Sequence, residues 1–108
     1  METKEIILRV KDLIKDEDAW VQKKYASNEA GEFLAAGDLP SATKWCLAGA
    51  VEKVCGCGTH VGDVVGKQKA RIALEEALPP LKRSLEEFND THTHEEVVEV
   101  LDRCLASL

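Results

Sequence analysis

Apolar side chains recur at helical spacing near both ends of this chain, and this pattern limits the possible folds more than any other feature. Near the N-terminus Ile6, Val10 and Leu13 follow i, i+4, i+7 spacing, and Ile14 extends the same face. The spacing predicts an amphipathic helix over residues 3–15. Because its apolar face must be covered by other elements, we expect a packed helical domain.

The last helix has the clearest start signal in the sequence. Thr93-His94-Glu95-Glu96 is a capping box, in which the Thr93 hydroxyl accepts from the Glu96 N–H and the Glu96 side chain reaches back to the Thr93 N–H. The following residues predict a helix that runs to the end of the chain. Its apolar stripe consists of Val97, Val100, Leu101, Cys104, Leu105 and Leu108.

The middle of the chain predicts a buried helix over residues 41–54, with Ser41 as its N-cap. Gly49 lies between two alanines at its centre. A glycine inside a helix costs about 1 kcal/mol relative to alanine, so we expect another element to pass close to the backbone at this position. The Gly-rich sequence that begins at Cys55 ends this helix.

Two further helical segments are expected before the capping box. Ala70, Ala73, Leu74 and Ala77 predict one over residues 63–78, which the Pro79-Pro80 pair ends, with these four side chains facing inward. A short turn of helix is expected over residues 81–88. Asn89, Asp90, Thr91 and His92 are expected to form a loop before the last helix.

Residues 19–36 have no clean helical period. Asn28-Glu29-Ala30-Gly31 has turn chemistry, so a small β-hairpin that pairs the preceding residues with residues 32–34 is one prediction, and irregular chain is the other. The predicted fold is mainly α: a compact bundle of four to five helices, with this hairpin between the first and second. At 108 residues, positions 1–108 are expected to form a single globular domain.

Charge is unevenly distributed along the chain. The formal net charge is −6, which argues against direct nucleic-acid binding because phosphate contacts need a concentrated basic surface. Residues 84–102 contain no Lys or Arg. We predict that this stretch binds a protein partner with a basic surface, and a solvated helix face is the alternative. The candidate interaction residues, here called the acidic surface, are Glu86, Glu87, Asp90, Glu95, Glu99 and Asp102.

Neither a signal-peptide core nor an apolar run of about 20 residues is present, so a cytoplasmic protein without membrane contact is predicted. In that reducing compartment the four cysteines are expected to be thiols.

Cys55-x-Cys57-x-x-His60 is a candidate zinc sequence, which His92 and His94, or Cys46, could complete. Structural zinc sites prefer two or more residues between paired cysteines, so the preferred interpretation is a glycine-rich loop with small apolar fillers. No metal or other cofactor is therefore predicted. No catalytic residue is assigned either, because the cysteines lack the sequence signature of a known catalytic class.

The segment Asn89–His94 could bind a small ligand or an anion, since it precedes a helix N-terminus. The plainer interpretation is that Asn89 and Asp90 shape the loop through local hydrogen bonds, while Thr93 caps the helix and both histidines lie at the surface. Trp20 and Trp45 are expected to be core anchors.

Three motifs together resemble a known family: Asp18-Ala19-Trp20, Trp45-Cys46-Leu47-Ala48-Gly49-Ala50, and Phe88-Asn89-Asp90 before the capping box. The family is a domain of unknown function in short bacterial and phage proteins. It has a Trp, a Trp-Cys-x-x-Gly-Ala helix and an aromatic-Asn-Asp turn; Phe88 stands where a Trp is expected. The resemblance implies a shared fold and no transferable activity.

We therefore favour a non-enzymatic protein-interaction module, of the kind that a phage-type inhibitor or adaptor of a host protein represents, acting through the acidic surface. The alternative is a small-ligand or metal-binding protein, with an enzyme as one form of it, that uses the Cys55-Cys57-His60 and Asn89–His94 loops. A homodimer through the exposed part of the last helix is a third hypothesis.

Overall fold

The computed structural model describes the chain except residues 1, 29–32, 35–41, 57–61 and 81–83. The described α-helices are α1 (Thr3–Ile14), α2 (Leu47–Val54), α3 (Val64–Ala77), α4 (Leu85–Thr91) and α5 (His94–Ala106), and a 3-10 turn, η1 (Glu17–Ala19), follows α1. The strands are β1 (Ala26–Ser27), β2 (Phe33–Leu34) and β3 (Lys44–Trp45). The prediction of a mainly helical fold with a small hairpin is confirmed.

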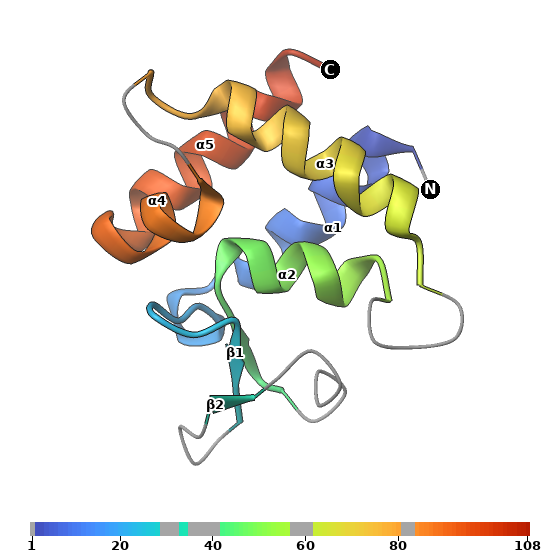
Figure 1. Cartoon of the computed structure of the whole chain (residues 1–108). Coiled ribbons are helices and arrows are strands. Elements are labelled where there is room, and N and C mark those ends of the chain that lie inside the picture. Colours follow the sequence, from blue (N-terminus) through green and yellow to red (C-terminus); the bar gives the residue numbers. More distant parts are fainter. Residues whose placement is uncertain (1, 29–32, 35–41, 57–61, 81–83) are drawn as a thin grey trace.

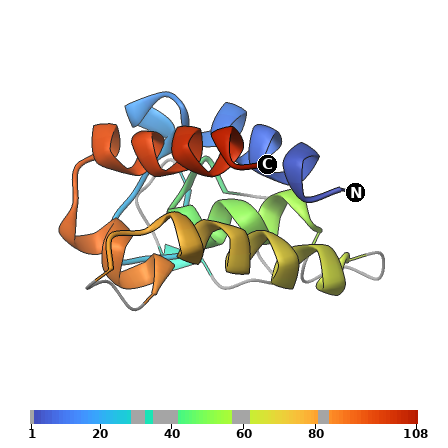
Figure 2. The same cartoon turned by 90° about the horizontal axis from the view of Figure 1, so that it is seen from above.

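The long helices form two layers (Figures 1 and 2). Seen from above, α1 and α5 lie in one layer and α2 and α3 in the other, with α2 packed against α1 and α3 against α5. The short helix α4 and the strands lie toward one end of this arrangement. The layers share one cluster of buried apolar side chains, to which all five α-helices contribute. None of the described helices is long and apolar enough to cross a lipid bilayer.

The helices with strong local signals begin and end close to their predicted positions. On α1, the side chains of Ile6, Val10 and Ile14 are fully buried. The helix α3 follows Asp63, whose carboxylate accepts from the Gly66 N–H. The capping box of α5 is formed as predicted. Its apolar stripe ends before Leu108, which is 49% exposed.

The predicted start of the second helix is wrong. Lys44 and Trp45 are extended and pair with Ser27 and Ala26 of β1, so α2 begins only at Leu47. Pairing with β1 satisfies backbone groups that a helix would otherwise have used, and an aromatic side chain suits a half-buried strand. Residue 41, the predicted cap, lies outside the described residues.

The hairpin consists of β1 and β2, which are antiparallel, with Ala26 opposite Leu34 and Ser27 opposite Phe33. With β3 on the other side of β1, the sheet order is β2-β1-β3. Its predicted turn, at residues 28–31, lies mostly outside the described part of the chain.

The predicted fourth helix is shifted along the sequence. It starts after Ser84, whose hydroxyl accepts from the Glu87 N–H, and continues to Thr91. Asn89 and Asp90 are therefore helical, and the prediction that they lie in a loop is wrong. The reason is that their side chains bond to distant segments and leave the local backbone free to remain helical.

Candidate functional site

Asn89 connects three segments that are far apart in the sequence. Its Oδ1 accepts from the indole Nε1 of Trp20 at 2.6 Å and from the backbone N–H of Leu47 at 2.9 Å. Its Nδ2 donates to the carbonyl of Val21 at 3.0 Å and to Oδ1 of Asp90 at 3.3 Å. The side chain is fully buried and every position of its amide is used, so Asn89 is a structural connection rather than a ligand contact.

The connecting segment of residues 20–25, here called the arm, lies along α4. The Gln22 amide donates to the carbonyls of Asn89 and His92, which satisfies acceptors at the C-terminal end of α4. The Lys23 N–H donates to Oδ1 of Asp90 at 2.6 Å. Lys23 has a φ of 66°, an uncommon conformation for a lysine, and this hydrogen bond helps to hold it there.

The start of α2 lies directly beneath the arm. Cys46 is its N-cap, and the thiol Sγ accepts from the Gly49 N–H at 3.2 Å. A Cβ at Gly49 would lie 1.9 Å from the carbonyl oxygen of Tyr25, so a glycine is required here. The close approach expected from the sequence is thus confirmed, and the arm is the element that makes it.

Tyr25, Glu86 and Arg71 join the arm to α4 and α3. The Tyr25 hydroxyl donates to Glu86 Oε2 at 2.8 Å, and Arg71 Nη2 lies 3.0 and 3.2 Å from the two Glu86 oxygens. This bond to Glu86, with burial, raises the pKa of Tyr25 to about 12. Burial alone would raise the pKa of Glu86, but the bonds from Tyr25 and Arg71 outweigh it and lower that pKa.

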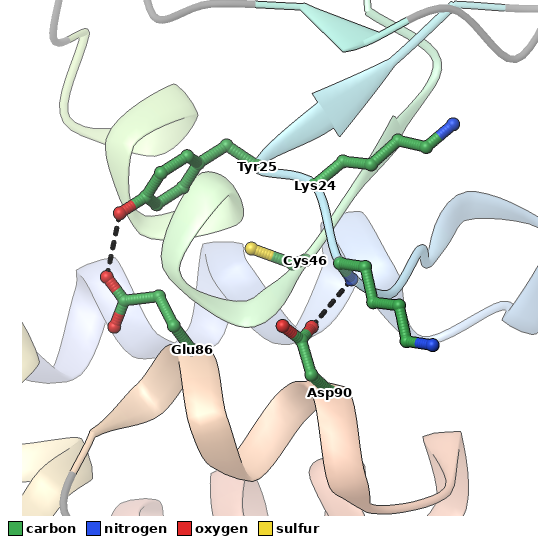
Figure 3. A pocket seen from close by; sticks show the side chains of 6 residues that line it. Lys24, Tyr25, Cys46, Glu86 and Asp90 are labelled. Carbon is green, nitrogen blue, oxygen red and sulfur yellow. Dashed lines mark hydrogen bonds between the residues drawn. The ribbon is translucent and has the colours of Figure 1, made fainter.

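A cavity of about 240 Å³ lies between the arm and α4 (Figure 3). In the figure the Cys46 thiol is turned toward the space between Tyr25 and Glu86, and the Lys24 side chain extends away from both. Burial raises the pKa of the Cys46 thiol to about 11, so the thiol is protonated at neutral pH. The cavity is lined by Lys23, Lys24, Tyr25, Cys46, Glu86 and Asp90.

The acidic surface is divided between two helices. Glu86 and Asp90, one helical turn apart on α4, line the cavity, and Glu87 between them is exposed. On α5, Glu99 pairs with Arg103 and Asp102 pairs with Lys11 of α1. Glu95 is exposed in the first turn of α5. In the described part of the chain, Glu86 and Asp90 are thus the members of the acidic surface that line this cavity.

The described candidate metal ligands do not form a cluster that could hold a metal ion. Cys55 is buried at the C-terminus of α2, and Cys57 and His60 lie outside the described residues. Among the described residues, no group of three His, Cys, Asp or Glu side chains could hold a metal ion. Cys46, Cys55 and Cys104 are not in disulfides.

The two predicted surface histidines are half-buried and serve as helix contacts. His92 stacks on Phe88, with ring centroids 4.0 Å apart, and its Nδ1 lies 3.0 Å from the Phe88 carbonyl. His94 Nε2 lies 2.6 Å from the carbonyl of Ile14 at the end of α1.

Of the two expected core anchors, Trp45 is buried, with 8% of its surface exposed. Trp20 is only partly buried, and its indole packs against the core and the His94 ring. Sequence reasoning missed the arm residues Gln22, Lys23 and Tyr25. They carry no periodic or motif signal, since their partners lie more than 60 positions away.

Comparison with known proteins gives a family match. A family model described as a family of unknown function (DUF6197) matches residues 1–107. No curated protein matches, and no solved structure matches.

Proposed function

Since the chain belongs to the family of unknown function DUF6197, we propose its function from the site: it is a cytoplasmic, non-enzymatic module that binds a basic protein partner. The observation that carries the proposal is the position of Glu86 and Asp90, whose carboxylates line one cavity from successive turns of α4. Paired carboxylates at a concave surface complement a cationic side chain. Exposed Glu87 and Glu95 extend the negative charge beyond the cavity.

The chemistry of the cavity favours binding over catalysis. Its nucleophilic candidate is the Cys46 thiol, and the raised pKa of that thiol keeps it in the unreactive protonated form. The Tyr25 hydroxyl also stays protonated, because its pKa is about 12 and it already donates to Glu86. A general acid or base works best with a pKa near the working pH, which neither group has.

The size of the cavity supports a protein partner over a large ligand. At about 240 Å³ it is smaller than the roughly 300–1,000 Å³ of pockets that enclose drug-sized molecules. It therefore suits one side chain at the edge of a larger contact. We propose a phage-type inhibitor or adaptor of a host protein as the biological class of this protein.

The test is a pull-down with tagged protein from a bacterial lysate at low and high salt, read by mass spectrometry. The variant Glu86→Gln/Asp90→Asn/Glu95→Gln should lose the partner that wild type captures at low salt, since surface charge pairs weaken with screening. Glu75→Gln is the control, because Glu75 is exposed on α3 and is not a cavity residue. Equal capture by the triple variant and wild type would refute the proposal.

The alternative is a small ligand or metal bound by this protein, and it makes a different prediction. Native mass spectrometry of the purified protein would then show a retained mass, and elemental analysis would show about one equivalent of metal. A retained ligand without a salt-sensitive partner would favour this alternative.

A further inference from the structure

On the basis of the proposed function, we propose that the cavity between the arm and α4 is a receptor for one arginine side chain of the partner protein. Three features carry this inference: unused acceptor capacity on the carboxylates, a wall suited to the arginine stem, and rigid placement of both acidic groups.

Acceptor capacity is greatest at Asp90. Its Oδ1 accepts from Lys23 and Asn89, whereas its Oδ2 accepts no hydrogen bond from any residue in the described part of the chain. In Figure 3 this second oxygen is turned toward the side of the cavity where Cys46 and Glu86 lie. A carboxylate has about four acceptor positions, so Asp90 can bind an incoming N–H donor without losing its present partners.

Glu86 already binds a guanidinium within this protein. Both of its oxygens lie within 3.2 Å of Arg71 Nη2, and this leaves acceptor positions that Arg71 and Tyr25 do not occupy. Side chains four positions apart on a helix have Cβ atoms about 5–6 Å apart. A planar guanidinium with five N–H donors can reach two such carboxylates, whereas an ammonium is a point charge.

The rest of the cavity suits the stem of an arginine. The Tyr25 ring, on a side chain that is 37% exposed, and the Cys46 thiol offer apolar surface for methylene groups. An aromatic ring also stacks favourably with a guanidinium. Lys23 and Lys24 also line the cavity, and the Lys24 side chain extends away from Cys46 and Glu86.

The carboxylates are held in place before any partner arrives. The Lys23 N–H fixes Asp90, and Tyr25 and Arg71 fix Glu86. Binding therefore requires little ordering of the receptor groups, which favours recognition of a single side chain.

The experiment is a ¹⁵N–¹H NMR titration of the whole chain with the blocked peptide acetyl-Gly-Arg-Gly-amide. The expected result is saturable shifts at the amides of Lys23, Tyr25 and Asp90. The same peptide with citrulline, which keeps the shape but lacks the charge, should bind roughly tenfold more weakly, because charge-assisted hydrogen bonds are the stronger ones. The lysine peptide should bind more weakly than the arginine peptide.

A variant pair locates the site. Asp90→Asn should weaken binding of the arginine peptide roughly tenfold, while Glu75→Gln, an exposed carboxylate on α3 that does not line the cavity, should leave it unchanged. If Asp90→Asn disturbs folding, the citrulline comparison still decides, because it uses the unaltered protein. Absence of shifts in the arm, or equal binding of arginine and citrulline, would overturn the inference.

The inference and the proposed function fail in different ways. If the pull-down finds a salt-sensitive partner that the triple variant loses, but the arginine peptide does not shift the cavity amides, the interaction module stands and the arginine receptor is wrong. If the peptide binds as expected but the triple variant retains every partner, the cavity recognises arginine and the proposed function is wrong.

Discussion

At the scale of the residue, the site depends on a few residues with defined structural tasks. Asn89 satisfies polar groups of the arm and of α2, and Gly49 leaves room for the Tyr25 carbonyl. Cys46 both caps α2 and lines the cavity. Because these three residues are buried, changing one of them should affect stability as well as binding.

Replacing Asn89 should be among the most destabilising single changes in the protein. Asn89→Ala leaves the Leu47 N–H and the Trp20 indole N–H without this acceptor, and we expect a loss of roughly 3 kcal/mol in the free energy of unfolding. Urea denaturation followed by tryptophan fluorescence measures it. The control is Thr91→Ala, an exposed site on the same helix, for which a change of about 0.5 kcal/mol is expected. Equal losses would contradict the connecting role of Asn89.

Two glycine-to-alanine substitutions should differ sharply in their effect on the stability of the fold. At Gly49 an added methyl group meets backbone, so Gly49→Ala should destabilise the fold by roughly 2 kcal/mol even after the gain in helix propensity. At Gly66 the nearest atoms belong to the Asp63 side chain, which can rotate away. Gly66→Ala should therefore change stability by less than about 1 kcal/mol, since loss of the cap and gain of propensity offset each other. Thermal unfolding by circular dichroism compares the two, and similar melting temperatures would refute the close approach.

The buried thiol predicts a loss of stability in alkali. Burial raises the pKa of Cys46 in the folded protein from 9.0 to about 11. The contribution of the protonated thiol to the free energy of unfolding is therefore fully present below about pH 9 and is lost as the pH rises toward 11. The expected loss at pH 11 is roughly 2 kcal/mol. Urea unfolding of wild type and Cys46→Ala at pH 8 and pH 11 isolates the contribution of Cys46 to the loss of stability. The contribution of Tyr25 cancels in this comparison, because Tyr25 titrates in both proteins. An identical loss in the two proteins would rule out a contribution from Cys46.

At the scale of the element, α4 is short yet makes many of the long-range polar contacts of the site. Its residues Glu86, Asn89 and Asp90 bind the arm, and Glu86 also binds α3 through Arg71. A seven-residue helix is too short to be stable alone, so these contacts are what holds α4 in place.

The energetic coupling between the arm and α4 can be measured with a double-mutant cycle of Tyr25→Phe and Glu86→Gln. Both side chains are partly exposed, so we expect a coupling free energy of about 0.5–1 kcal/mol that decreases at high salt. Urea unfolding of the four proteins at low and high salt measures this value. The pair Arg9 and Glu5, on the exposed face of α1, serves as the reference for a purely local ion pair. A coupling of zero would mean that Tyr25 and Glu86 stabilise the fold independently.

At the scale of the whole molecule, one apolar cluster joins the helical layers to the end that carries the site. It includes Ile6 of α1, Trp45 of β3 and Leu101 of α5. We therefore expect the chain to unfold as one unit. The transition followed by tryptophan fluorescence, which reports on Trp20 and Trp45, should coincide with that followed by far-ultraviolet circular dichroism. A separate, earlier fluorescence transition would show that the site unfolds independently of the helices.

The candidate site could be predicted only in part. Asn89 and Asp90 were singled out as a polar constellation and Glu86 as part of the acidic surface, but their grouping with Tyr25 and Cys46 was not foreseen. The hydrogen bonds that join the arm and the start of α2 to residues 86–92 span 42 to 70 positions, a separation at which no local pattern carries information.

The sequence by itself determined α1, α3 and α5, because apolar period and capping chemistry act within a few residues. The Thr93 capping box and the Ile6–Ile14 stripe are local, and they appear in the structure as predicted. Only the tertiary structure decided where α2 begins and where α4 ends. Strand pairing with β1 takes Lys44 and Trp45 from the predicted helix, and the distant partners of Asn89 and Asp90 leave their own backbone helical. At those positions the free energy of long-range pairing exceeds the local preference of the chain.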